Sequence, residues 1–114
     1  REGIAVVTEA ERVPVAVQRA VPLGLVAGEL IANALQHAFP AGRTGRITVA
    51  VSRDGTRGRL TVTDDGCGMP AGLYPGGGGL GFQLVSGLAA QSGARVAVES
   101  GAGGSRWSVD FPAA

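Results

Sequence analysis

Two pairs of segments in which polar and apolar residues alternate place the strongest constraint on how this 114-residue chain folds. The first pair, 46–52 and 59–63, is separated at 53–56 by residues typical of a turn, including an Asp-Gly step. The second pair, 95–99 and 106–111, is separated by a glycine-rich stretch. Alternation predicts strands with one buried face, so the sequence predicts two antiparallel hairpins covered by a layer of helices.

Helical periodicity supplies that layer. Apolar residues recur every three or four positions over 23–38, directly after Pro22, and proline is favoured in the first turn of a helix. A second helix is predicted over 80–91, and the glycine-dense segment 64–81 before it is predicted to be a loop.

Two further strands are predicted ahead of the first helix, over 4–7 and 13–17, the second weakened by Pro14. This order of elements favours an α+β fold, a two-layer α/β sandwich whose mixed sheet carries helices on one face. We expect one domain over residues 1–114. Its start at Arg1 rather than at a methionine indicates a domain excised from a longer chain.

The composition excludes several classes of site. The chain has no lysine, so neither a P-loop lysine nor a Schiff-base lysine is available. Cys67 and His37 are each alone, which excludes an internal disulfide and a metal site built on several cysteines or histidines. The net charge of +1 argues against nucleic acid or an anionic membrane as the main partner, and no apolar stretch could span a bilayer. Because the lone cysteine suits the cytoplasm, we expect a cytoplasmic domain.

Three segments could carry chemistry, and the first is a row of polar residues on the first predicted helix. Glu29, Asn33 and His37 are spaced four apart, so they share one stripe of the helix surface. A carboxylate, an amide oxygen and an imidazole in one row could hold a hydrated Mg²⁺ ion and contact its phosphates. The alternative is an ordinary amphipathic helix with a solvated polar face.

The second segment follows the strand 59–63, where Asp64 precedes Gly66 and Gly68. A carboxylate at this point could accept a hydrogen bond from the amino group of adenine, and the glycines would let the backbone approach a ligand closely. The alternative is an Asp-Gly turn that binds nothing.

The third segment is the glycine run 76–79, which with Gly81 opens the second predicted helix. Free amides at the start of a helix form an anion site, and glycines admit a close phosphate. The alternative is a flexible linker. A dinucleotide-binding fold is excluded, because its glycines would follow the first parallel strand.

The order of these three segments resembles the N, G1 and G2 boxes of the histidine-kinase ATPase family, within the Bergerat-fold group. The stretch 22–40 is most similar to the short-lid, HWE-type subfamily, and 96–112 is similar to the last two strands of the family. The resemblance covers essentially the whole chain. Two departures are that Gln36 stands where the family often has lysine, and that no separate F box lies between the glycine motifs.

The resemblance implies a role for each matching residue. Asn33 would coordinate Mg²⁺, Glu29 would help to hold the metal shell or polarise the attacking group, and His37 would lie near the phosphates. Asp64 would bind the adenine amino group, and 69–78 would form the lid over the nucleotide. The other residues implied to bind ATP are Gly66, Gly68, Met69, Gly79, Leu80, Gly81 and Ser105.

The resemblance further implies a catalytic domain that binds Mg-ATP and supplies the γ-phosphoryl group for histidine phosphorylation in a two-component sensor kinase. Its partners would be the dimerising, phosphoacceptor helical domain of the same kinase and a downstream response regulator, with no nucleic acid and no membrane contact. The chain has no such helical hairpin and no second histidine, so it would be inactive alone. The alternatives are an anti-sigma-factor serine kinase, which shares the fold, and a degenerate nucleotide-binding or protein-interaction module.

Overall fold

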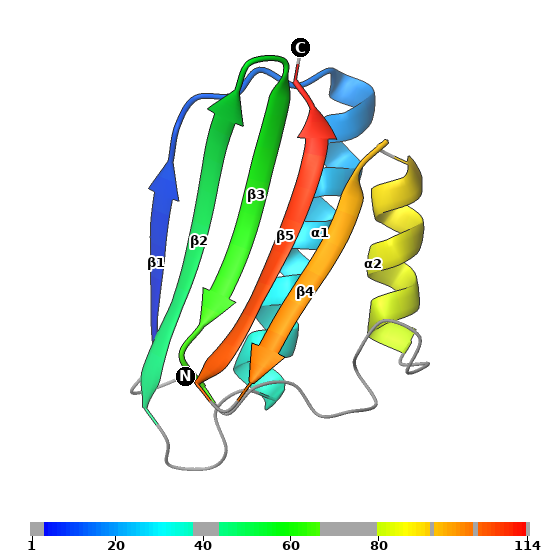
Figure 1. Cartoon of the computed structure of the whole chain (residues 1–114). Helices are drawn as coiled ribbons and strands as arrows, with labels where there is room; N and C mark the ends of the chain where they lie inside the picture. Colours follow the sequence, from blue (N-terminus) through cyan, green and yellow to red (C-terminus); the bar gives the residue numbers. More distant parts are fainter. Residues whose placement is uncertain (1–3, 38–43, 67–79, 92, 102, 114) are drawn as a thin grey trace.

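The computed structural model describes residues 4–37, 44–66, 80–91, 93–101 and 103–113 (Figure 1). Within these residues the helices and strands follow one another as β1 (Ile4–Ala10), α1 (Val17–His37), β2 (Gly45–Asp54), β3 (Arg57–Asp64), α2 (Leu80–Gln91), β4 (Arg95–Gly101) and β5 (Gly104–Pro112).

The strands form one sheet in the order β1-β2-β3-β5-β4. β1 runs parallel to β2, and every other neighbouring pair is antiparallel. Figure 1 shows α1 and α2 side by side behind the same face of this sheet, and the two helices pack against each other. The predicted α+β fold, with a mixed sheet and helices on one face, is confirmed.

Both predicted hairpins are confirmed, and both extend beyond the segments that alternate most clearly. β2 pairs with β3 as far as Asp54 opposite Arg57, which leaves Gly55 and Thr56 as a two-residue turn. Gly55 has a φ of +59°, a left-handed conformation that glycine adopts at little steric cost and that short hairpin turns require.

The core lies between the sheet and the helices. Successive residues of a strand point to opposite faces, so Val62 and Trp107 are buried while Thr63 and Arg106 next to them are not. Burying one aliphatic side chain, such as that of Val62, stabilises the fold by about 1.5–3 kcal/mol. The largest fully buried side chains are those of Leu30, Ile47, Val26, Val62, Val85 and Val109.

The predicted strand over 13–17 is wrong, because residues 11–16 form no strand. Val13 and Val15 are instead half-buried against the core, which accounts for their alternation without any strand pairing. Pro14 lies between them and has no N–H group to donate to a neighbouring strand. The connection therefore contributes apolar side chains to the core but no sixth strand to the sheet.

α1 begins earlier than predicted, at Val17 rather than after Pro22. The carbonyl oxygen of Ala16 accepts hydrogen bonds from the N–H groups of Arg19 and Ala20, at 2.9 and 3.1 Å, and these close the first turn. Pro22 consequently lies inside the helix, where it removes one backbone hydrogen bond. Packing of α1 against the rest of the domain thus outweighs the local preference of proline for a helix start.

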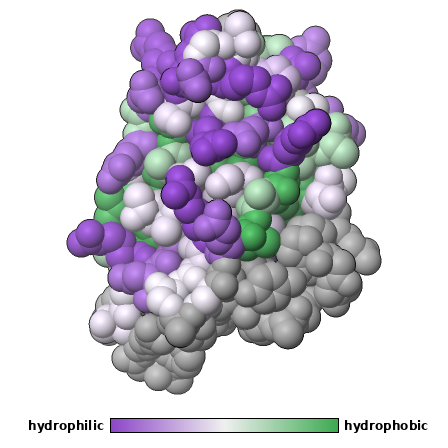
Figure 2. Space-filling model, viewed as in Figure 1, coloured by the Kyte–Doolittle hydropathy of each residue, from purple (hydrophilic) through white to green (hydrophobic). Residues whose placement is uncertain are grey.

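The opposite face of the sheet carries neither described helix, and Figure 2 shows many hydrophilic side chains on it. On this face Arg59 of β3 and Asp110 of β5 form an ion pair with Nε and Oδ1 2.6 Å apart. The hydrogen bond from Arg59 lowers the pKa of the Asp110 carboxyl below its ordinary value. Because solvent reaches both groups, the pair adds little to stability. Neither described helix is long and apolar enough to cross a membrane.

Candidate functional site

The sequence motifs gather at one end of the domain. Figure 1 shows the C-terminal half of α1, the end of β3, the start of α2 and the turn between β4 and β5 at this end. The antiparallel order of the strands explains this, because β3 and β4 run towards the end from which β5 leaves.

Asp64 is the central residue of this end. It is the last residue of β3, and only 5% of its surface is exposed. Its Oδ1 accepts a hydrogen bond from the backbone N–H of Gly66 at 3.0 Å, and its Oδ2 accepts one from the Ser105 hydroxyl at 2.5 Å. Two donors from different segments therefore fix the orientation of one buried carboxylate.

The register of the sheet places Ser105 beside Asp64. Asp64 pairs with Ile47 of β2 on one side and with Ser105 of β5 on the other. At the start of β5, Gly104 has a φ of +126°, and a Cβ atom there would lie 2.0 Å from the carbonyl oxygen of Asp64. Only glycine fits this close approach, so Gly104 allows β5 to bring Ser105 up to the carboxylate.

The neighbouring Asp65 holds the backbone on the other side of Asp64. Its N–H group donates to the carbonyl oxygen of Arg46 at 3.3 Å, and its Oδ1 accepts from the Arg46 N–H at 2.7 Å. No role was predicted for Asp65 or Gly104 from the sequence. The signal for both was their position, one directly after Asp64 and the other directly before Ser105.

The row on α1 lies on the side of the helix that faces α2. Glu29 and Asn33 are both half-buried. They follow Pro22 by seven and eleven residues, which are close to two and three full helical turns, so all three residues lie on the same side of α1. Pro22 borders a groove together with Leu88 of α2, which places that stripe next to α2. His37 is the last residue of α1, and its side chain lies outside the described residues.

The remaining predicted residues are placed only in part. Leu80 and Gly81 form the start of α2, but their side-chain surroundings lie outside the described residues. Gly68, Met69, Gly79 and the predicted lid 69–78 also lie outside the described residues. The structure therefore brings together Asp64, Gly66 and Ser105 through direct hydrogen bonds, and it places Glu29 and Asn33 together on α1.

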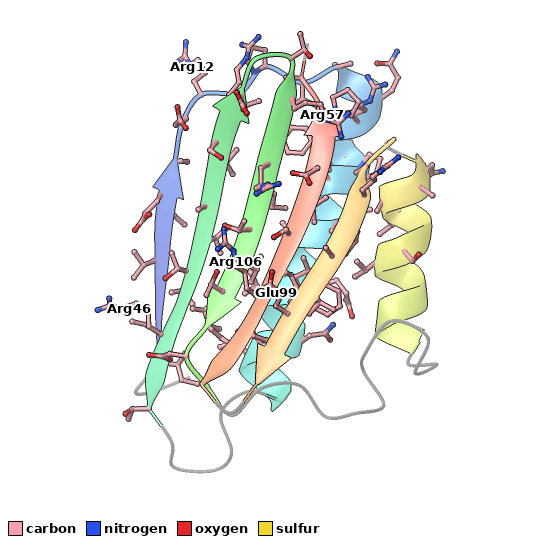
Figure 3. The ribbon with its side chains drawn as sticks, viewed as in Figure 1. Arg12, Arg46, Arg57, Glu99 and Arg106 are labelled. Carbon is pink, nitrogen blue, oxygen red and sulfur yellow. The ribbon has the colours of Figure 1, made fainter. Side chains whose placement is uncertain are left out.

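A hollow of about 360 Å³ adjoins Asp64 at the turn between β4 and β5. Glu99 of β4 and Arg106 of β5 line it, and Figure 3 shows both on the strands next to this end of the sheet. Among the described residues, no three His, Cys, Asp or Glu side chains come close enough to hold a metal ion by themselves. Glu29 and Asn33 would offer Mg²⁺ one carboxylate and one amide oxygen, and Mg²⁺ commonly completes such a set with waters and phosphate oxygens.

The family model of histidine kinase-, DNA gyrase B- and HSP90-like ATPases matches residues 18–114. The chain belongs to this ATPase family. The match includes α1, the end of β3 that carries Asp64, and the hairpin that carries Ser105. The match confirms the resemblance noted in the sequence. Asp64 and Ser105 therefore lie inside an ATPase domain.

The relatives of this ATPase domain are histidine kinases. Blue-light-activated histidine kinase 2 of Erythrobacter litoralis is 37% identical over 114 residues, which cover 98% of this chain and 33% of that protein. Sensor histidine kinase PdtaS of Mycobacterium tuberculosis is 39% identical over 69 residues, 59% of this chain and 14% of that protein. The ATPase domain thus spans a third or less of these curated relatives.

The fold is also that of a solved histidine kinase. The histidine kinase domain of the Erythrobacter litoralis EL346 blue-light activated histidine kinase has a TM-score of 0.90 and 37% sequence identity to this chain. The likeness covers 98% of this chain and 56% of that chain. The ATPase domain is therefore of the histidine kinase type.

Proposed function

We propose that this domain binds Mg-ATP and supplies the γ-phosphoryl group to a histidine on the phosphoacceptor domain of its kinase. The observation that carries the proposal is the Asp64 carboxylate, held by Gly66 and Ser105 at the end of β3. A carboxylate has about four lone-pair sites, and these two hydrogen bonds leave room for a further donor. The exocyclic amino group of adenine is such a donor.

Glu29 and Asn33 would face the triphosphate. Both are half-buried on the α2 side of α1, so neither behaves as part of a fully solvated face. Asn33 would coordinate Mg²⁺, and Glu29 would hold the metal's water shell or polarise the attacking group. When bound, Mg²⁺ would neutralise part of the phosphate charge that develops during transfer.

The start of α2 would bind the phosphates. The first amides of a helix have no partner within the helix and carry the positive end of its dipole. α2 begins at Leu80, so its first amides include those of Leu80 and Gly81, two residues that the resemblance implies to bind ATP. This arrangement supports the predicted roles of Leu80 and Gly81, whereas Gly79 lies outside the described residues. The partners would be the phosphoacceptor helical domain and a response regulator, and we place the reaction in the cytoplasm.

We expect Asn33→Ala to weaken the binding of Mg-ATP by roughly tenfold or more while leaving metal-free nucleotide binding nearly unchanged. Alanine keeps the helix but removes the amide oxygen offered to the metal. Calorimetric titration with ATP, with and without Mg²⁺, measures both affinities. Gln18→Ala removes an exposed amide from the same helix and is the matched control. Equal losses with and without Mg²⁺ would show that Asn33 supports the fold and not the metal.

We expect the isolated chain to bind ATP without labelling itself from γ-³²P-ATP. The proposal places the acceptor histidine on a separate helical domain, whereas His37, the last residue of α1, belongs to the binding helix. Label should appear when a phosphoacceptor helical domain is added, and Asn33→Ala should abolish it. Stable label on the chain alone would contradict the proposal, and transfer only to a serine-bearing antagonist would favour the anti-sigma alternative.

A further inference from the structure

The face of the sheet that carries neither described helix has a hollow at the end where β2 turns into β3. It encloses about 530 Å³. Successive residues of a strand point to opposite faces, and the lining residues alternate with the buried side chains of their strands, which places the hollow on this face. The polar residues that line it are Ser52, Asp54, Arg57, Arg59, Arg95 and Asp110.

One carboxylate of the hollow is already neutralised. The register places Asp110 of β5 between Arg59 of β3 and Arg95 of β4. Arg59 binds both carboxylate oxygens, with Nε 2.6 Å from Oδ1 and Nη2 3.2 Å from Oδ2. Within the part of the chain that the structure describes, neither Arg95 nor Arg57 forms an ion pair. Two guanidinium groups of the hollow are therefore available to an anion from outside the domain.

Phe111 fixes the backbone beneath these arginines. Gly58 separates Arg57 from Arg59, and a Cβ atom at Gly58 would collide with the ring of Phe111. That ring is buried and belongs to the core on the helix side of the sheet. β3 is thus tightly packed at this point, and the two arginines beside Gly58 both point away from Phe111, towards the hollow.

The chemistry of the lining indicates an acidic ligand. A guanidinium group presents its N–H donors in a fork that matches a carboxylate or a phosphate. The described residues that line the hollow include no apolar side chain, whereas sites for small molecules are mostly apolar. The hollow therefore fits a charged segment of a polypeptide better than a small organic ligand. Its three arginines and two aspartates leave a net charge of +1.

We propose that this hollow binds an acidic segment of a partner polypeptide, whose carboxylates pair with Arg57 and Arg95. These arginines stand on strands separated by β5, so their backbones lie about 10 Å apart, and two carboxylates on one segment can reach both. A nucleic acid or an anionic membrane presents a dense array of phosphates, which Asp54 and Asp110 would repel. An acidic segment can instead place an N–H group or a basic side chain beside Asp54.

The hollow is far from the proposed nucleotide site. Arg57 begins β3 and Asp64 ends it, and this length of strand spans about 23 Å. Figure 3 shows Arg57 near the upper end of the sheet and Arg46, which Asp65 contacts, towards the lower end. A bound segment would therefore leave the nucleotide site open. The inference goes beyond the proposed function and does not depend on it.

Fluorescence anisotropy with an acidic peptide tests the hollow. The probe is a fluorescein-labelled octapeptide of alternating Glu and Ser, titrated with the 114-residue chain at about 0.05 M salt, where exposed charges are weakly screened. We expect Arg57→Gln and Arg95→Gln each to weaken binding about threefold, and the double variant about tenfold. Both side chains are exposed, so neither change should unfold the domain. Arg12→Gln removes an exposed arginine outside the lining at the same end of the domain (Figure 3), and this control should weaken binding by less than about 1.5-fold.

A gain of affinity provides a second test. Asp110→Asn removes the charge that neutralises Arg59, so it should strengthen binding of the same peptide about threefold. Asp65→Asn makes the same change of charge near the other end of the sheet, and it should leave the affinity within about 1.5-fold.

The outcomes separate the possible occupants. A loss for Arg12→Gln as large as the losses for Arg57→Gln and Arg95→Gln would overturn the proposal, as would no binding by the unmodified chain. Tighter binding of oligothymidylate or of phosphatidylserine vesicles, with the same dependence on Arg57 and Arg95, would assign the hollow to nucleic acid or to a membrane instead. The affinity for ATP should be unchanged in both arginine variants. Loss of ATP binding by the unmodified chain would overturn the proposed function and leave this inference intact.

Discussion

Gly104→Ala should destabilise the domain by at least about 3 kcal/mol, because it combines backbone strain with a steric clash. At a φ of +126° a residue with a side chain is strained, and the new Cβ would lie 2.0 Å from the carbonyl oxygen of Asp64. That oxygen belongs to the backbone of the central strand β3, so it cannot swing aside as a flexible side chain could. Relief requires β5 to move away from β3.

The loss should appear as a lower midpoint in urea and a melting temperature lower by roughly 10–20 °C. Because the same shift withdraws the Ser105 hydroxyl from Asp64, ATP affinity should also fall in the fraction that remains folded. Gly103→Ala is the matched control, since a Cβ at Gly103 meets nothing within 4 Å and should change stability by less than about 0.5 kcal/mol. Similar stabilities for the two variants would show that position 104 does not lie against the carbonyl oxygen of Asp64.

The sequence predicted the two hairpins and the mixed sheet, though not the order of the strands, because alternation reports which face of a strand is buried. The β3 and β5 segments alternate strictly, and the structure pairs them across the centre of the sheet. The same signal failed at Val13 and Val15, which are half-buried against the core without belonging to a strand. Alternation records burial on one side, and it cannot distinguish a strand from a connection that crosses the end of a core.

The site was predicted unevenly for a different reason. Asp64 lies in a short motif that could be interpreted locally, and Ser105 was implied by the resemblance alone; the structure joins them through a hydrogen bond. Asp65 and Gly104 act through partners far away in the sequence, Arg46 and the backbone of Asp64 respectively. Their roles depend on the register between strands, and a local sequence pattern does not predict that register. The exposed side chains of Val17 and Val21 were not predicted to lie on α1, because the helix was predicted to begin only after Pro22.

Asp64→Asn should lower the affinity for ATP by roughly ten- to hundredfold, since a hydrogen bond to a charged acceptor is worth about 1.5–3 kcal/mol. In the folded protein the amide can still accept from the Gly66 N–H through its oxygen, and its NH₂ group can donate to the Ser105 hydroxyl. The structural hydrogen bonds therefore survive in altered form, and stability should change little. The negative acceptor proposed to face the adenine amino group is lost.

The Asp64→Asn variant should also discriminate less strongly against GTP. Guanine presents a carbonyl oxygen where adenine presents its amino group, so a carboxylate repels guanine whereas an amide can turn its NH₂ group towards it. Asp65→Asn makes the same change of charge one residue away, at an exposed side chain whose oxygen accepts from the Arg46 N–H, and it should leave both nucleotide affinities within about twofold. Titrations with ATP and GTP, together with thermal melts of each variant, separate base recognition from stability. If folded Asp64→Asn protein binds ATP as tightly as the unmodified chain, the adenine lies elsewhere, and Asp64 serves only to join the end of β3 to Gly66 and Ser105.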